Sequence, residues 1–225
     1  MDSGHRLIGR GRSVHRPFLN CWPSGSSSVT VIHKTTNVLL NPANAIDAFT
    51  VAGNGLASAT PRRNASFGLR PFSLAYRADG SIIVVESFNA APNASAISSY
   101  RSAAGGRMNV VDGSVANGQT DACWVVITGD GRYAFVANFG SGTISSYRFN
   151  ADEDLRLVNG AAASTGAMSQ PVDLALSSDS KYLYLLLRGT GAVASYRIDG
   201  GTLRPLGVVT GGLPVADGAS GLASY

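Results

Sequence analysis

The sequence has few cysteines and no long hydrophobic run. Cys21 and Cys123 are the only two cysteines among 225 residues, which argues against a disulfide framework and against a thiolate metal site. Cys123 is therefore expected to be a small buried hydrophobic side chain. No stretch approaches the roughly 18 consecutive apolar residues of a membrane span, and the N-terminus lacks the apolar segment of a signal peptide. These absences predict no membrane partner and favour the cytoplasm.

Charged residues are also scarce, at 14% of the chain, and the net charge is +4. Four arginines against Asp2 place +3 of this charge in the first twenty residues, namely Arg6, Arg10, Arg12 and Arg16. Such a stretch can contact an acidic partner, but no basic stripe interleaved with aromatic residues follows it. We therefore expect residues 1–26 to be a solvated, disordered tail and predict no nucleic-acid partner.

The residues that are abundant suit tight turns and short strands. Glycine occurs 27 times, and hydrophobic residues make up 44% of the chain. These proportions favour short β-strands joined by turns over long surface helices. The composition predicts an all-β fold.

A repeat of about fifty residues organises the sequence. Ile97–Arg101 (Ile-Ser-Ser-Tyr-Arg) returns as Ile144–Arg148 and, with changes, as Val193–Arg197, at shifts of 47 and 49 residues. Turn signals at Asp79, Asp130 and Asp179 move in step between apolar runs. Each unit predicts four antiparallel strands with a hairpin between the first two; in the third unit these are residues 123–127, 133–138, 143–149 and 155–158. This period and unit predict a β-propeller of about four four-stranded blades, forming a partial or reduced ring.

The two ends of the repeat are incomplete in complementary ways. Ala45–Val51 is a degenerate first copy, and Val29–Ile32 is expected as its second strand, so that this unit lacks a first strand. Residues 218–224 align with the first-strand segment Arg70–Tyr76, and we expect them to complete the first unit and leave it without a free edge. The predicted propeller domain, 27–225, then has the units 27–68 with 216–225, 69–119, 120–169 and 170–215.

Four segments carry a resemblance to a known family: Gly118–Val126, Gly131–Asn138, Gly142–Ser145 and Pro171–Leu176. They resemble the lactonase-type β-propellers, which include the propeller 6-phosphogluconolactonases, from about residue 45 onward. The resemblance implies a seven-bladed ring, of which this chain is similar to the C-terminal part. Because an open arc exposes apolar blade faces, we expect the chain to close as a smaller ring, to self-associate through those faces, or to be marginally stable.

Positions that vary while the frame repeats are candidates for a site at one end of the channel. Arg70, Asp121 and Gln170 align at the start of the first strands, and Ser73, Trp124 and Asp173 align three residues later. The two aspartates can equally cap turns between blades. The residues that we assign to substrate binding are Arg70, Asp121, Trp124, Asp173 and Arg188.

Lactone hydrolysis needs a general base and a group that holds the developing oxyanion. Glu86 is our candidate base because it ends the apolar run Ile82–Val85, where burial favours a raised pKa. A structural pairing with Arg70 or Arg101 is the alternative. The resemblance implies His, Glu and Arg in the channel, which makes His33 a second catalytic candidate; a partly exposed histidine without a role is the alternative.

The sequence thus predicts a hydrolase of a sugar lactone such as 6-phosphogluconolactone, with a non-catalytic binding scaffold or an inactive remnant as alternatives. Whether the chain is an enzyme at all stays open at this point. No phosphate-binding loop, zinc spacing or nucleophile elbow is present, so we predict no cofactor and no metal.

Overall fold

The computed structural model describes residues 29–32, 35–40, 43–150, 154–215 and 218–224. These residues form four antiparallel sheets of four strands, each built from consecutive strands. The first sheet contains β1 (Val29–Ile32), β2 (Thr35–Leu40), β3 (Ala45–Thr50) and β4 (Arg62–Ala65). The second contains β5 (Pro71–Tyr76), β6 (Ser81–Glu86), β7 (Ala96–Ala103) and β8 (Arg107–Ala116). The third contains β9 (Ala122–Ile127), β10 (Tyr133–Asn138), β11 (Thr143–Phe149) and β12 (Leu155–Ser164). The fourth contains β13 (Pro171–Leu176), β14 (Tyr182–Leu187), β15 (Ala192–Asp199) and β16 (Thr202–Thr210).

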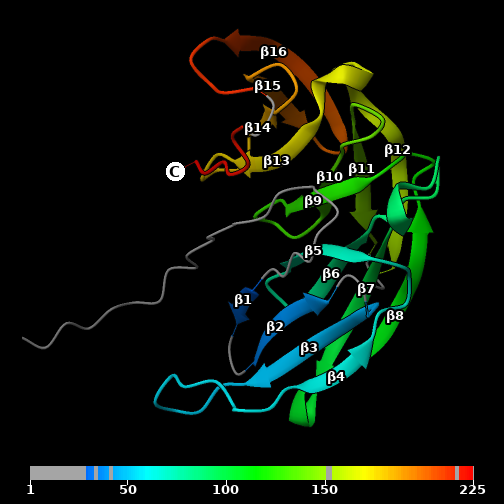
Figure 1. The fold of residues 1–225 in the computed structure, drawn as a ribbon, viewed down its shortest axis with the longest axis vertical. Coiled ribbons are helices and arrows are strands. Elements are labelled where there is room, and N and C mark those ends of the chain that lie inside the picture. Colours follow the sequence, from blue (N-terminus) through cyan, green and yellow to red (C-terminus); the bar gives the residue numbers. More distant parts are fainter. Residues whose placement is uncertain (1–28, 33–34, 41–42, 151–153, 216–217, 225) are drawn as a thin grey trace, which may run out of the picture.

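The four sheets lie side by side in an arc (Figure 1). The innermost strands β1, β5, β9 and β13 face its concave side, and β4, β8, β12 and β16 form the outer wall. Contacts between sheets join β5 to β9 and β9 to β13. This is the arrangement of blades in a β-propeller, and it confirms the predicted fold class.

Apolar residues fill the space between neighbouring blades. All six residues of β6 are buried, as its uninterrupted apolar run predicts for a strand covered on both faces. The tyrosine that recurs in each unit is a packing residue, because Tyr100 and Tyr147 are fully buried. Both buried hydroxyls have hydrogen-bond partners. The Tyr100 hydroxyl accepts a hydrogen bond from the N–H of Phe67, and the Tyr147 hydroxyl donates one to the carbonyl of Val115.

The hairpins between the first two strands of a blade share one construction. The carboxylates of Asp79, Asp130 and Asp179 each accept the backbone N–H two residues further on, at 2.9, 3.0 and 3.1 Å. Gly80 and Gly131 supply the positive φ, 83° and 69°, that the turn needs. The hairpins therefore lie at one rim of the arc, and the starts of the inner strands lie at the other.

The ends of the repeat differ from the expectation. Val29–Ile32 is the first strand of the first sheet, and Thr35–Leu40 is the second, so this sheet has four strands of its own and needs none from residues 216–225. Residues 218–224 instead lie along the last blade, where the N–H of Leu222 donates to the Asp173 carboxylate at 2.7 Å and the Ser224 hydroxyl donates to the Leu176 carbonyl. The prediction that residues 218–224 supply the missing strand of the first unit was therefore wrong.

Other expectations fall on residues that are not described, and one is corrected. The basic tail 1–26 and the candidate His33 lie outside the described residues. Cys123, expected as a small buried hydrophobic side chain, is fully buried in β9 but is disulfide-bonded.

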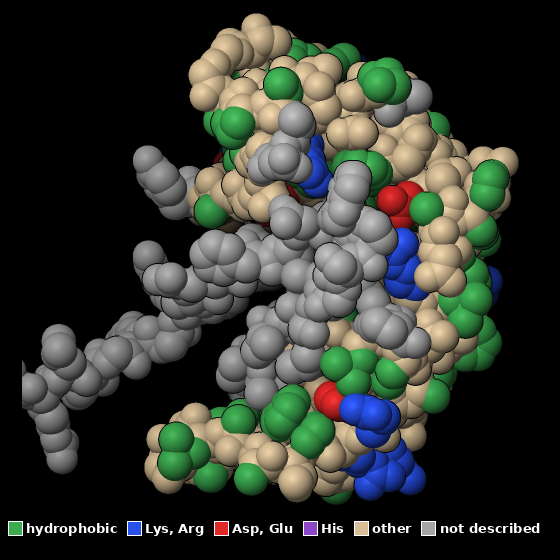
Figure 2. All heavy atoms as spheres, in the orientation of Figure 1, with side chains coloured by type: hydrophobic (Ala, Val, Ile, Leu, Met, Phe, Trp, Pro, Cys, Tyr) green, Lys and Arg blue, Asp and Glu red, His purple; other side chains and the backbone are tan. Residues whose placement is uncertain are grey.

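The outer wall exposes apolar side chains (Figure 2). Val110 and Val111 on β8 and Leu157 and Val158 on β12 are 39% to 44% exposed. The pairing of β8 with β7 and of β12 with β11 shifts register beside these residues, and such bulges protect an outer strand from pairing with another chain.

Candidate functional site

Three residues directly before inner strands share an unusual backbone conformation. Arg70 precedes β5, Asp121 precedes β9 and Gln170 precedes β13, with φ of 52°, 53° and 48°. Residues other than glycine seldom adopt this left-handed region, and where they do the conformation is costly and often serves a site. Their alignment in the sequence thus corresponds to one structural position at the rim.

A repeated hydrogen bond fixes this position in the second, third and fourth blades. The carbonyls of Arg70, Asp121 and Gln170 accept the N–H groups of the residues that follow the second strands, at 3.1, 2.9 and 3.1 Å. These donors are Ser87, Phe139 and Arg188. In these three blades the rim is therefore built from the start of the first strand and the end of the second.

The loop after β6 adds further strain at this rim. Phe88, Asn89 and Ala90 are consecutive left-handed residues, with φ of 49°, 56° and 57°. The N–H of Phe88 donates to the carbonyl of Leu69, and the N–H of Asn93 donates to Thr120 Oγ1 at 3.0 Å. The loop thus connects the backbone beside Arg70 with the backbone beside Asp121.

Asp121 and Arg70 interact electrostatically. Burial raises the pKa of the Asp121 carboxyl, and the positive charge of Arg70 lowers it in part. The Arg70 guanidinium carbon lies 5.9 Å from the centre of the Phe72 ring. Within the described part of the chain the Asp121 carboxylate accepts no hydrogen bond and forms no direct ion pair, so that both charged groups remain available to a ligand.

The Glu86 side chain forms no hydrogen bond with the side chain of Arg70 or Asp121 in the described part of the chain. It is fully buried at the end of β6, and its oxygens accept the Ser98 hydroxyl at 2.5 Å, the Ser114 hydroxyl at 2.6 Å and the Gly68 N–H at 2.8 Å. Its partners are therefore neutral donors of its own blade and of the segment before β5, in place of the arginine pairing considered from the sequence.

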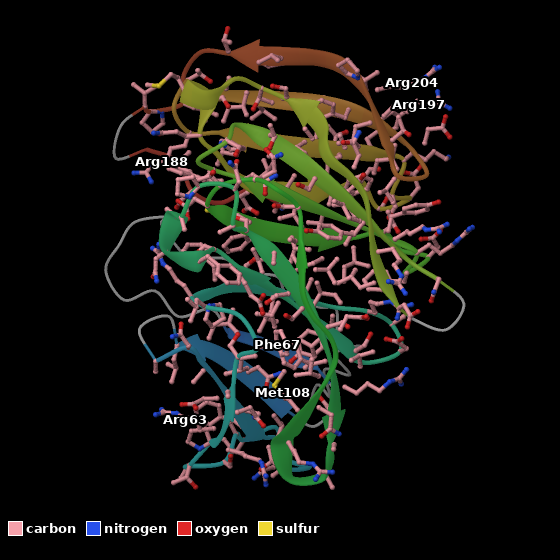
Figure 3. All side chains as sticks on the ribbon, turned by 90° about the vertical axis from the view of Figure 1, so that its right-hand side faces the viewer. Arg63, Phe67, Met108, Arg188, Arg197 and Arg204 are labelled. Carbon is pink, nitrogen blue, oxygen red and sulfur yellow. The ribbon has the colours of Figure 1, made fainter. Side chains whose placement is uncertain are left out.

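The remaining sequence candidates lie in three different surroundings. Trp124 is 5% exposed and packs in the core between the third and fourth blades, beside Phe72 and Val172. Asp173 is 1% exposed, and its oxygens accept the N–H groups of Leu174 and Leu222. Arg188 is 7% exposed and lies at the same rim as Asp121, opposite the rim of Arg197 and Arg204 (Figure 3). The structure brings Arg70 and Asp121 together and leaves Trp124 and Glu86 inside the blades.

Sequence reasoning missed the partners of Glu86, although a signal was present. Glu86, Asn138 and Leu187 end the second strands, and Ser98, Ser145 and Ala194 occupy one position of the third strands. Where the second strand ends in a polar residue, in the second and third blades, the third strand has a serine at this position. Where it ends in leucine, in the fourth blade, the third strand has an alanine. This correlated change marks a contact within each blade.

Nothing in the described residues resembles a metal centre or a membrane helix. No group of three or more His, Cys, Asp or Glu side chains that could hold an ion occurs there. No helix in that part of the chain is long and apolar enough to cross a membrane. A cavity of about 340 Å³ lies between the hairpins of the third and fourth blades, lined in part by Asp130, Tyr133 and Lys181, and so opens at the rim away from Arg70 and Asp121.

The fold and the rim define a β-propeller with a polar site where its inner strands begin. Residues 35–171, more than half of the chain, match the model of the family described as lactonase, 7-bladed β-propeller. The chain belongs to this family. No curated protein matches it.

Several solved structures share the fold at low sequence identity. A candidate 6-phosphogluconolactonase from Bacteroides uniformis has 16% identity and a TM-score of 0.70, over 82% of this chain and 57% of that one. A second candidate of the same kind from Bacteroides fragilis has 21% identity and a TM-score of 0.61, over 85% and 55%. The periplasmic gluconolactonase of Pseudomonas aeruginosa has 17% identity and a TM-score of 0.60, over 79% and 54%. This chain thus spans just over half the length of these structures.

Proposed function

We propose that the rim between the second and third blades hydrolyses a sugar lactone, with Asp121 as the general base and Arg70 as the group that holds the carbonyl oxygen. The observation that carries the proposal is the placement of these two charged side chains at one strained position of neighbouring inner strands. The membership of the chain in the lactonase family supports the same chemistry.

The reaction needs only these two groups and water. Asp121 takes a proton from a water molecule while the oxygen of that water forms a bond to the lactone carbonyl carbon. The carbonyl oxygen becomes an oxyanion beside Arg70. When the intermediate collapses, the bond from this carbon to the ring oxygen breaks. The ring oxygen leaves with the proton that Asp121 held, and the product is the open hydroxy acid.

Burial suits Asp121 to this task. Its raised pKa makes the carboxylate a stronger base than a solvated aspartate, and the positive charge of Arg70 favours the ionised form that accepts the proton. The substrates to test are 6-phosphogluconolactone and gluconolactone, named for the similar structures from Bacteroides and Pseudomonas.

The test compares lactone opening by the purified chain and by Asp121→Asn, followed as acid release at constant pH above the rate in buffer. Loss of a general base costs about 10²–10⁴-fold in rate, so we expect Asp121→Asn to lose at least 100-fold. Asp130→Asn is the control, because that exposed carboxylate belongs to a hairpin at the other rim.

Two results would count against the proposal. Equal rates for the wild-type chain and Asp121→Asn would remove Asp121 as the base. A wild-type rate equal to that of buffer would remove the activity, and calorimetry with the hydroxy acid product would then show whether the rim binds sugar acids without catalysis.

A further inference from the structure

Glu86 holds the segment that carries Arg70. Its Oε1 accepts the N–H of Gly68 at 2.8 Å, and Gly68 lies two residues before the left-handed Arg70. The approach is so close that a Cβ at position 68 would overlap the Glu86 carboxylate and the Ser114 hydroxyl. The fixed carboxylate therefore determines where this segment runs.

Two further backbone N–H groups of the same segment are held by hydrogen bonds. The N–H of Phe67 donates to the Tyr100 hydroxyl at 2.8 Å, and the N–H of Arg70 donates to Asn44 Oδ1 at 2.7 Å. The Phe67 ring covers Gly113 of β8, where a Cβ would overlap it. Glu86 is the one acidic side chain among these anchors.

In the next blade, Asn138 is linked by hydrogen bonds to the backbone before Asp121. It ends β10 as Glu86 ends β6, and its Nδ2 donates to Ser145 Oγ at 2.8 Å. Its Oδ1 accepts Asn117 Nδ2 at 3.0 Å, and Asn117 Oδ1 in turn accepts the N–H of Gln119 at 2.9 Å. Gln119 lies two residues before Asp121, the same offset that separates Gly68 from Arg70.

We propose that Glu86 and Asn138 are positioning residues, which fix the backbone two residues before Arg70 and Asp121 and so place the two charged groups of the site. The consequence for catalysis rests on the proposed function, whereas the positioning itself can be measured without it. Glu86 in this role is an acceptor of hydrogen bonds and not the base that its sequence context suggests.

The physical basis is the strength of a buried carboxylate that is fully hydrogen-bonded. Glu86 accepts hydrogen bonds from three donors and has no exposure to water, so none of these bonds can be replaced by a bond to solvent. Breaking one of these hydrogen bonds would leave a buried polar atom without a partner, which costs free energy. The segment before β5 is thereby held in a conformation that Arg70 would not adopt by itself.

Amide exchange followed by NMR of the 23.2 kDa chain tests the positioning directly. The variants Glu86→Leu and Asn138→Leu introduce the residue that the fourth blade has at this position, Leu187. We expect Glu86→Leu to speed exchange at Gly68 roughly tenfold or more with little change at Gln119, and Asn138→Leu to do the reverse. Unchanged exchange at both amides, or equal acceleration at both, would overturn the proposal. Leu187→Met is the matched control and should change neither.

Activity separates a positioning residue from a base. Glutamine keeps an acceptor for Gly68, so Glu86→Gln should retain lactone hydrolysis within about threefold and keep the wild-type pH profile, while Glu86→Leu loses about tenfold or more in kcat/KM. A loss of 100-fold or more in Glu86→Gln, with the acidic limb of the profile abolished, would identify Glu86 as the base and overturn the assignment. If the wild-type chain has no activity, the amide exchange still decides the positioning role.

Discussion

Asp173 combines almost complete burial with an acidic side chain. Its exposure is 1%, and both carboxylate oxygens accept backbone N–H groups, from Leu174 and Leu222, at 2.7 Å. Burial raises the pKa of Asp173 to about 7, although these two hydrogen bonds lower it in part. This residue therefore makes stability depend on pH near neutrality.

We predict that the free energy of unfolding falls between about pH 4 and pH 7 because of Asp173. The unfolded chain loses this proton near pH 4, whereas the folded chain keeps it up to about pH 7, so the stabilisation is complete below pH 4 and is lost as the pH rises through 7. Denaturant unfolding of the wild-type chain and Asp173→Asn at pH 5 and pH 8 should show their difference changing by about 3 kcal/mol. A difference independent of pH would contradict this titration.

Strand β12 depends on a glycine where it passes the neighbouring blade. A Cβ at Gly160 would overlap the backbone carbonyl of Asn117, which cannot turn away as a side chain would. We expect Gly160→Ala to lower the free energy of unfolding by about 1–3 kcal/mol. Gly207→Ala in β16, where a Cβ meets nothing within 4 Å, should change it by less than about 1 kcal/mol. Thermal unfolding of both variants checks this, and equal effects would show that the close approach is relaxed easily.

Strands that carry an apolar run or a recurring motif could be predicted from the sequence, whereas β2, whose first half is polar, could not. The predicted bounds of β10 and β11 coincide with the structure. Strand β2 was missed because Thr35-Thr36-Asn37 is polar. Asn37 is nevertheless buried, since its Nδ2 donates to the hydroxyl of Tyr76 in the next blade at 2.6 Å. Such a partner is distant in the sequence and cannot be inferred from local pattern.

The structural equivalence of Arg70 and Asp121 could be predicted from the sequence, whereas the surroundings of Glu86 were missed. The alignment of repeats identified Arg70 and Asp121 as equivalent, and the structure places both at one rim in the same conformation. The direction of the Glu86 side chain does not follow from its apolar run, because the end of such a strand can face a channel or a neighbouring strand. The correlated change at positions 86 and 98 is the sequence signal for the contact with Ser98, whereas the contact with Ser114 leaves no such signal.

At the scale of the whole molecule, the arc is held together blade by blade. The inner strands contact their neighbours in chain order, and the hairpin rim adds a second set of links. Arg77 of the second blade donates from Nε to the carbonyl of Gly131 in the third at 3.1 Å, and its guanidinium carbon lies 4.3 Å from the centre of the Phe149 ring. The N–H of Gly129 donates to Ser180 Oγ of the fourth blade at 2.9 Å.

We predict that Arg77 couples the second and third blades. Its side chain is 14% exposed, so removing it loses a partly desolvated cation–π contact and a hydrogen bond to Gly131, which together are worth about 1–3 kcal/mol. Arg77→Ala should lower the denaturant midpoint accordingly, and Arg77→Lys should recover only part, because an ammonium group lacks the planar face that stacks on a ring.

Arg132→Ala is the control for the contacts of Arg77 with the third blade. Arg132 is exposed and its guanidinium lies 5.9 Å from the ring of Tyr133 in its own blade, so its loss should cost less than about 1 kcal/mol. Equal midpoints for Arg77→Ala and Arg132→Ala would show that the hairpin rim contributes nothing to blade coupling. A repeat structure whose neighbours are weakly coupled unfolds in stages, so a second transition that appears in Arg77→Ala alone would place the weakest junction of the arc between its second and third blades.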